Sequence, residues 1–409
     1  MRRRILRSIA SISGASLAGQ IISVSSVTLL ARFYEPTAFG MFAIYISILN
    51  LVKVLVSLRL ETLIVPQKSV NCANKVTVLG MVTSAIFCVV FFIPFVLLTS
   101  ILLHTTVDFD ILFFAYSCGI FSAYVIFNEN RLNYVESYGT VGLIRFFQPS
   151  CVAIVTLIMA YLGISQGLVY GHFIAVSLLT GFIIFTLRGL SHHIPKRREL
   201  LVFLRKNKAT IKFLYPAALV DTIGLQIPVL LIGALFSLEL AGQFGLAWRL
   251  LITPTGILGG AIAMVFFKSF AKPQDAGLTR QARLITTWKW MLIIGVAPVL
   301  VILLHGDKIF VFALGEPWLD AGRMAMVLSI MVLAIFVSSP TSRAAIVIGM
   351  HKAAFIVTLC TALYRIGALL IGYYYSSLMI GLVIWVACEI LAIIIYNWMV
   401  WRASGKDIA

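Results

Sequence analysis

About twelve apolar segments, each about 20 residues long, follow one another along this chain of 409 residues. A helix needs about 20 apolar residues to cross the hydrocarbon core of a bilayer, because each residue adds about 1.5 Å of length. Backbone groups in lipid must find their hydrogen-bond partners within the protein, so each segment predicts a helix. The predicted spans are residues 10–33, 38–58, 77–103, 110–128, 142–163, 167–187, 211–235, 240–267, 285–304, 322–348, 354–374 and 379–401.

The composition excludes a soluble protein. Hydrophobic residues make up 61% of the chain and charged residues 11%, whereas a soluble domain carries about 25% charged residues. The segments lack the ten-residue alternation of a membrane β-barrel. The sequence therefore predicts an all-α polytopic membrane protein, with about twelve transmembrane helices in two six-helix pseudo-repeat lobes around a central cavity.

The net charge of +17 would suggest nucleic acid in a soluble protein, but here its distribution follows the predicted spans. Of the 32 basic residues, 25 fall on one side, and only Arg32, Lys308 and Arg323 fall on the other. The positive-inside rule then places both termini in the cytoplasm and makes the lipid bilayer, not nucleic acid, the partner.

A long basic connection at residues 187–212, predicted as a loop, divides the chain into lobes 1–200 and 201–409. A short match of Gly40-Met41-Phe42 to Gly242-Gln243-Phe244 supports two parallel repeats. The longest outer connection is predicted at residues 305–322. No predicted loop is long enough for a catalytic domain.

Two opposite charges are predicted at the same depth in consecutive spans. Arg365 and Glu389 each lie 12 residues from a turn near Ser377, which is about 18 Å at the helical rise. Two interpretations stay open and are compatible: a structural ion pair, or a direct part in transport.

Other polar residues recur at helical spacing. Asn50, Lys53, Ser57 and Glu61 are predicted to share one face of the second span, and Gln20 belongs to a similar stripe in the first. Helix packing through small and polar residues is the alternative interpretation. It accounts less well for a cation such as Lys53.

The second half of the chain shows similar features. Arg249 shares a face with Gly256 and Gly260 in the eighth span, and Arg343 follows the Ser-Pro kink of VSSPTSR in the tenth. Asp221 lies between two prolines of the seventh span. Such kinked spans either line the path or bend statically.

Away from their ends, the predicted spans hold four cations and two acids, so a water-filled interior would attract anions such as diphosphate. The predicted substrate-cavity residues are Lys53, Arg249, Arg343, Arg365, Asn50 and Gln20, and the ion-pair or coupling candidates are Asp221, Glu389 and Glu61. The sequence contains no phosphate-binding GxxxxGK[ST] loop, no HExxH and no His/Cys cluster. It therefore predicts neither an enzyme nor a metal or other cofactor.

Two stretches, residues 29–66 and 312–355, resemble bacterial O-antigen and polysaccharide flippases of the Wzx type. These belong to the multidrug/oligosaccharidyl-lipid/polysaccharide exporter superfamily. The first stretch contains an LAR…P..FG.FA turn and an R.E element at Arg59 and Glu61, and the second an LG..W..AG turn before the Ser-Pro kink. The order and position of these motifs carry the resemblance.

The resemblance implies that undecaprenyl-diphosphate-linked oligosaccharide is moved to the outer leaflet of the bacterial inner membrane by alternating access. It implies a cation-lined cavity, to which Lys53 and Arg249 would contribute, although arginine is more usual in the second span. It adds a polysaccharide polymerase and a chain-length regulator as candidate partners. The alternatives are a small-molecule or drug exporter and, less favoured, a membrane glycosyl polymerase.

Overall fold

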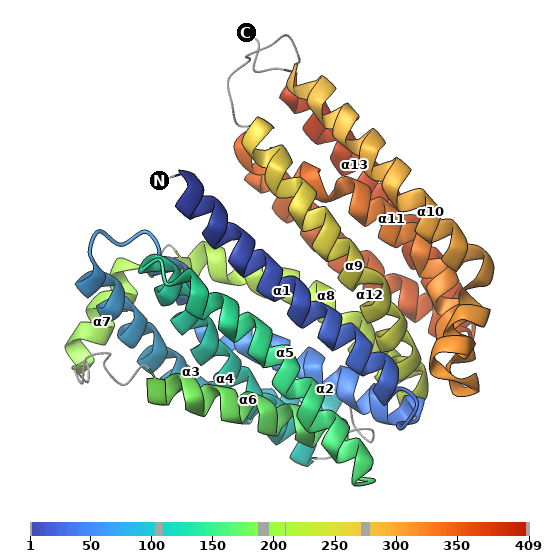
Figure 1. The fold of residues 1–409 in the computed structure, drawn as a ribbon, viewed down its shortest axis with the longest axis horizontal. Coiled ribbons are helices and arrows are strands. Elements are labelled where there is room, and N and C mark those ends of the chain that lie inside the picture. Colours follow the sequence, from blue (N-terminus) through green and yellow to red (C-terminus); the bar gives the residue numbers. More distant parts are fainter. Residues whose placement is uncertain (1, 103–108, 187–195, 209, 271–278, 406–409) are drawn as a thin grey trace. The chain divides into compact units, whose positions relative to one another are not determined.

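The computed structural model describes residues 2–102, 109–186, 196–208, 210–270 and 279–405, and the regular elements within them are helices (Figure 1). The chain folds into two compact units, Met1–Gln226 and Ile227–Ala409. The lobe boundary predicted between residues 200 and 201 stays a prediction. The first unit contains α1 (Arg2–Leu30), α2 (Pro36–Ser57), η1 (Leu60–Leu63), α3 (Val70–Leu102), α4 (Phe109–Tyr134), α5 (Tyr138–Tyr161), α6 (Gly167–Thr186), α7 (Arg197–Lys206), η2 (Thr210–Leu214) and the start of α8 (Tyr215–Leu235). The second contains the rest of α8, α9 (Leu238–Phe270), α10 (Arg280–Leu314), η3 (Glu316–Trp318), α11 (Leu319–Val347), α12 (His351–Tyr374) and α13 (Leu378–Ser404).

Ten helical segments among the described residues are long and apolar enough to cross a membrane, in α2–α6, α8 and α10–α13. α1 adds a shorter apolar helix, Gly14–Leu30. Large apolar side chains lie exposed on these helices, among them Val89 at 75% and Ile93 at 67% of α3, as expected for a surface that faces lipid. The chain is therefore a multi-pass membrane protein, and the count of twelve spans stays a prediction.

Two predicted connections are wrong, because helices form within them. The predicted outer connection at residues 305–322 is mostly helical: α10 bends at His305, where the backbone is non-helical, and continues to Leu314. The apolar residues 309–314 extend the helix beyond the polar ones. Gly306 allows close packing, since a Cβ there would lie 2.8 Å from Cγ of Met326 in α11. Similarly, the predicted loop at residues 187–212 contains α7.

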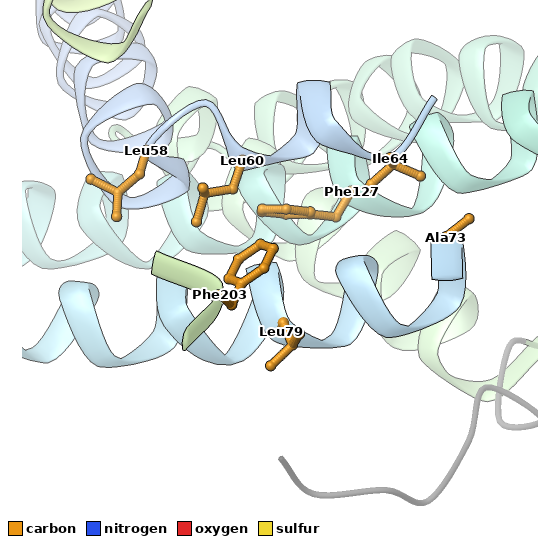
Figure 2. Close-up of a cluster of buried hydrophobic side chains, with 7 residues drawn as sticks. All are labelled: Leu58, Leu60, Ile64, Ala73, Leu79, Phe127 and Phe203. Atoms are coloured by element: carbon orange, nitrogen blue, oxygen red, sulfur yellow. The ribbon is translucent and has the colours of Figure 1, made fainter. Parts of the chain in front are cut away.

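The first unit is a helical bundle in which α1 packs on α5, α2 on α4, and α4 on α3 and α6. Gly19 lets α1 approach α5 closely, because a Cβ at this position would lie 2.7 Å from the carbonyl oxygen of Arg145. A separate apolar cluster lies where α2 ends. Figure 2 shows Leu58, Leu60 and Phe127 of this cluster together with Phe203, which α7 contributes.

In the second unit, α11 packs on α9, α10 and α13, and α12 packs on α13. The buried side chain of Gln243 joins α9 to the start of α11. Its Nε2 donates to the carbonyl of Pro317 at 3.1 Å, and its Oε1 accepts from the backbone N–H of Ala321 at 2.6 Å. The second bond satisfies a backbone N–H of the buried Ala321, in the first turn of α11, where no intrahelical acceptor is available.

Candidate functional site

Charged side chains gather in the first unit at the end of α2, where Glu61 is buried, Lys53 and Glu129 are half-buried, and Arg145 is exposed. The Nζ of Lys53 donates to Oδ1 of Asn50, one turn earlier, at 3.4 Å. Lys53 is also close enough to Glu61 and Glu129 to be attracted electrostatically by both. Glu129 of α4 in turn forms an ion pair with Arg145 of α5, at 3.5 Å. The arrangement is a network of alternating charges that links α2, α4 and α5.

Glu61 enters this network through a turn of the backbone rather than through helical spacing. α2 ends at Ser57, and both Leu58 and Arg59 adopt the left-handed conformation, with φ of 50° and 58°. The prediction that Glu61 shares a helix face with Lys53 is therefore wrong. Two consecutive left-handed residues end the helix, and Glu61 is buried in η1, which follows them.

The Glu61 carboxyl is 3% exposed and lies 3.5 Å from the guanidinium of Arg59. Burial raises the pKa of the Glu61 carboxyl, whereas a backbone N–H and the Arg59 charge act in the opposite direction. Desolvation is the largest of these effects, and protonation of Glu61 is therefore easier here than in water.

Two other predicted residues of the first unit lie on other helices. Gln20 is exposed on α1, one residue after the Gly19 contact with α5. Asp221 lies in α8, five residues before the unit ends at Gln226. Their predicted roles toward a substrate or a coupled ion stay predictions.

The second unit contains the predicted pair of Arg365 on α12 and Glu389 on α13. The Arg365 guanidinium donates through Nε at 3.0 Å and through Nη2 at 2.7 Å, one bond to each carboxylate oxygen. Trp385, one turn before Glu389, donates its ring N–H to the same carboxylate at 2.9 Å, and its ring lies 5.7 Å from the guanidinium. The predicted ion pair is thus confirmed, and its part in transport stays a prediction.

A cavity of about 470 Å³ lies in the second unit and reaches this pair. Glu389 lines it together with hydroxyl groups of α9, α11, α12 and α13. The lining residues are Ile252, Thr255, Gly256, Gly259, Gly260, Ala263, Ile335, Phe336, Ser338, Ser339, Ser342, Val357, Thr361, Glu389, Ala392, Ile393 and Tyr396. Glu389 therefore both pairs with Arg365 and forms part of the cavity wall.

Two sequence features meet at this cavity, the glycines of the eighth span and the serines around Pro340, and Thr361 of α12 joins them. The helices leave space there because Gly256 and Gly260 have no side chain, and a Cβ at either would meet nothing within 4 Å. Ser338 also donates to Asn397 on α13 at 2.8 Å. Thr341, which is buried, accepts a bond from the Trp288 ring N–H at 3.1 Å.

Neither Arg249 nor Arg365 is among the described residues that line this cavity. Arg249 lies on α9 about two turns before Gly256, and Arg365 reaches the cavity only through Glu389. The side chain of Arg343 lies outside the described residues. The predicted substrate contacts of these residues stay predictions.

Sequence reasoning missed Glu129, Arg145 and Trp385. The predicted span 110–128 leaves Glu129 on the cytoplasmic side, whereas the structure places Glu129 within a candidate span. Arg145 lies within both the predicted span 142–163 and a candidate span of the structure. The spacing of four residues between Trp385 and Glu389 could have indicated their hydrogen bond. Among the described residues, no group of three or more His, Cys, Asp or Glu side chains could hold a metal ion.

Comparisons with known proteins place the fold. The model of a family described as polysaccharide biosynthesis proteins matches residues 29–323. A search of curated proteins finds no match. The fold resembles those of solved transporters, one of which is described as a member of the MOP superfamily.

Three solved structures illustrate the similarity. The lipid II flippase MurJ, in an inward closed conformation, has a TM-score of 0.72 at 14% identity, over 95% of this chain and 86% of that one. An inward-facing multidrug resistance MATE family transporter has a TM-score of 0.58 at 16% identity, over 97% and 96% of the two chains. A MOP superfamily transporter from Pyrococcus furiosus, described as having a binding pocket of reverse polarity, has a TM-score of 0.56 at 17% identity, over 98% and 96%.

Proposed function

Because the chain belongs to the polysaccharide biosynthesis protein family, we propose that it is a flippase for undecaprenyl-diphosphate-linked oligosaccharide. It moves an O-antigen or related polysaccharide repeat unit from the cytoplasmic to the periplasmic leaflet of the bacterial inner membrane by alternating access. Both termini are cytoplasmic in this proposal. The observation that carries it is the family match over residues 29–323 of a chain made of candidate membrane-spanning helices.

The likeness to the lipid II flippase supports a lipid-linked cargo. Its TM-score of 0.72 exceeds the 0.58 of the multidrug transporter. The sequence supports the same class, since the predicted spans contain more cations than acids and a diphosphate is an anion that arginine binds in bidentate fashion. A polysaccharide polymerase and a chain-length regulator would then act next on the repeat unit.

The cavity of the second unit supports a place for the glycan. Its lining combines hydroxyl groups with the aromatic ring of Tyr396, and sugars offer hydroxyls for hydrogen bonds and C–H faces for aromatic contact. Because the charge of Glu389 is compensated by Arg365, the lining suits a polar, uncharged group. Arg249, on α9 of the same unit, is assigned to the diphosphate.

A small-molecule exporter is the second candidate, because the fold is shared with a multidrug resistance transporter. The two candidates differ in cargo. A drug exporter would move amphipathic cations without any lipid carrier, whereas the flippase would leave them in place.

The test is transport by the purified chain in vesicles. A fluorescent undecaprenyl-diphosphate-linked oligosaccharide is placed in both leaflets, and an impermeant quencher reports how fast the inner pool reaches the outside. We expect the protein to accelerate this movement and a cationic dye to stay in place. Movement no faster than in protein-free vesicles, together with dye export, would replace the flippase by the exporter.

A further inference from the structure

α7 is a short amphipathic helix held between two candidate spans. Its sequence is RRELLVFLRK. The preceding candidate span ends at Phe185, and the following one begins at Thr210, three residues after Asn207. Both neighbours cross the bilayer, so α7 is confined to the membrane surface.

One face of α7 is fixed to the first unit. Phe203, which is 6% exposed, lies in the cluster of Leu58, Leu60 and Phe127 (Figure 2). The Nζ of Lys75 on α3 donates to Glu199 at 3.1 Å. These contacts set how the helix is rotated and therefore which residues point outward.

The opposite face combines apolar and cationic side chains. At about 100° per residue, Arg198, Leu201 and Arg205 point away from Phe203. Val202 flanks them. Leu201 is 46% exposed and Val202 56%, and Arg198 and Arg205 are exposed as well.

The same pattern continues toward α8. Phe213 is 67% exposed and Leu214 44%, and the Nζ of Lys212 lies 5.5 Å from the Phe213 ring. Residues 196–212 contain seven basic residues and one acid, Glu199, whose charge Lys75 compensates. The positive-inside rule accounts for basic residues in a cytoplasmic connection. It does not account for large apolar side chains exposed on the same face of an ordered helix.

We propose that the outward face of α7 binds the anionic phospholipid headgroups of the adjacent leaflet. Leu201 and Val202 enter the boundary between headgroups and acyl chains, while Arg198 and Arg205 extend to the lipid phosphates. Through Phe203, this contact holds the end of α2 at a fixed depth. The proposal goes beyond the transport activity and does not depend on the cargo.

Hydrogen exchange of the full chain, reconstituted in vesicles, tests the proposal. One set of vesicles contains phosphatidylcholine alone, and the other contains phosphatidylglycerol in addition. Each basic residue near an anionic surface strengthens attachment by about fivefold. Arg197, Arg198 and Arg205 together therefore predict that α7 attaches on the order of 100-fold more strongly to the anionic vesicles than to phosphatidylcholine alone. We expect amide exchange in α7 to slow in the anionic vesicles and to recover when salt screens the charges.

The variant Arg197→Gln/Arg198→Gln/Arg205→Gln should lose the difference between the two vesicle types. A matched variant, Arg280→Gln/Arg283→Gln/Lys289→Gln at the start of α10, should keep it. If the triple variant fails to fold, the parent protein alone tests the proposal: the slower exchange of α7 in anionic vesicles should disappear as salt is added. Equal exchange in both vesicle types would overturn the proposal, as would equal protection by inorganic phosphate added to phosphatidylcholine vesicles.

Discussion

Removing one partner of the Arg365–Glu389 pair should destabilise the second unit strongly. The two side chains are 12% and 6% exposed and are 2.7 Å apart at their closest atoms. Opposite charges about 4 Å apart attract by about 4 kcal/mol at an effective dielectric constant of about 20. Arg365→Met would leave the Glu389 carboxylate buried without its cation, although the Trp385 ring N–H would still donate to it, and breaking such a pair costs about 3–5 kcal/mol.

This loss should be visible as a lower Tm of the detergent-solubilised protein. For a unit of the size of residues 227–409, each kcal/mol shifts Tm by about 2–4 °C, so we expect a decrease of at least about 6 °C. The double variant Arg365→Met/Glu389→Leu should recover most of the lost Tm. Replacing a buried ion pair by an apolar pair of similar volume often leaves the stability unchanged or raises it by about 1–4 kcal/mol. The charge swap Arg365→Glu/Glu389→Arg should recover part of the lost Tm.

The refuting result is a single variant whose Tm stays within about 2 °C of the parent protein. The same variants also separate the two roles of the pair. If the apolar double variant keeps its Tm but no longer transports, Glu389 acts at the cavity as well as in packing. If it keeps both, the pair is structural.

Three further predictions concern other sites. Arg249→Ala should abolish vesicle transport while leaving membrane insertion intact, and Arg249→Lys should retain part of the activity; full activity of the alanine variant would remove Arg249 from the substrate site. Gly256→Leu should fill the cavity and slow transport with little loss of Tm, whereas Gly181→Leu, at an equally open position in α6, should leave transport unchanged. Burial raises the Glu61 pKa above its ordinary 4.5, so the unfolded chain releases this proton first, and stability should fall as pH rises from 4.5 through the folded pKa. Glu61→Gln should flatten that slope in a pH series of Tm values, and an unchanged slope would assign it to other groups.

The Arg365–Glu389 pair was predictable from the sequence because a short turn sets the depth of both residues. α12 ends at Tyr374 and α13 begins at Leu378, and Ser377 accepts from the Ile380 N–H at the start of α13. With a constant helical rise, equal distances from the turn give equal depths. The counting works wherever consecutive helices are straight and tightly connected.

Glu61 and α7 show where such counting fails. Helical spacing from Lys53 assumes that the helix continues, but Leu58 and Arg59 turn left-handed without a glycine to mark the turn. The basic residues of 187–212 read as a solvated loop. The run LLVF between arginines is amphipathic at helical spacing, and this is the feature that could have predicted α7.

The cavity could be predicted only in part. Gly256, Gly260 and the serines near Pro340 are visible as small-residue faces, and small residues serve close helix packing as readily as open space. The choice between these depends on which faces of four helices meet, and this is a tertiary property. Gly259 illustrates the point: a Cβ there would lie 3.1 Å from Ser339 Oγ, whereas its neighbour Gly260 faces open space.

The structure changes how the predicted cations should be ranked as ligands of a diphosphate. Arg365 already makes two bonds to Glu389, and Lys53 lies near Glu61 and Glu129. A diphosphate at either cation would have to compete with a carboxylate that the fold holds in place, and the separation of that pair would carry the cost of an uncompensated buried charge. The excess of cations over acids in the predicted spans is therefore a poor guide to where an anion binds. What matters is whether a nearby carboxylate already neutralises each cation. Because one does so for Lys53 and for Arg365, both are weaker candidates for the diphosphate contact than the sequence suggests.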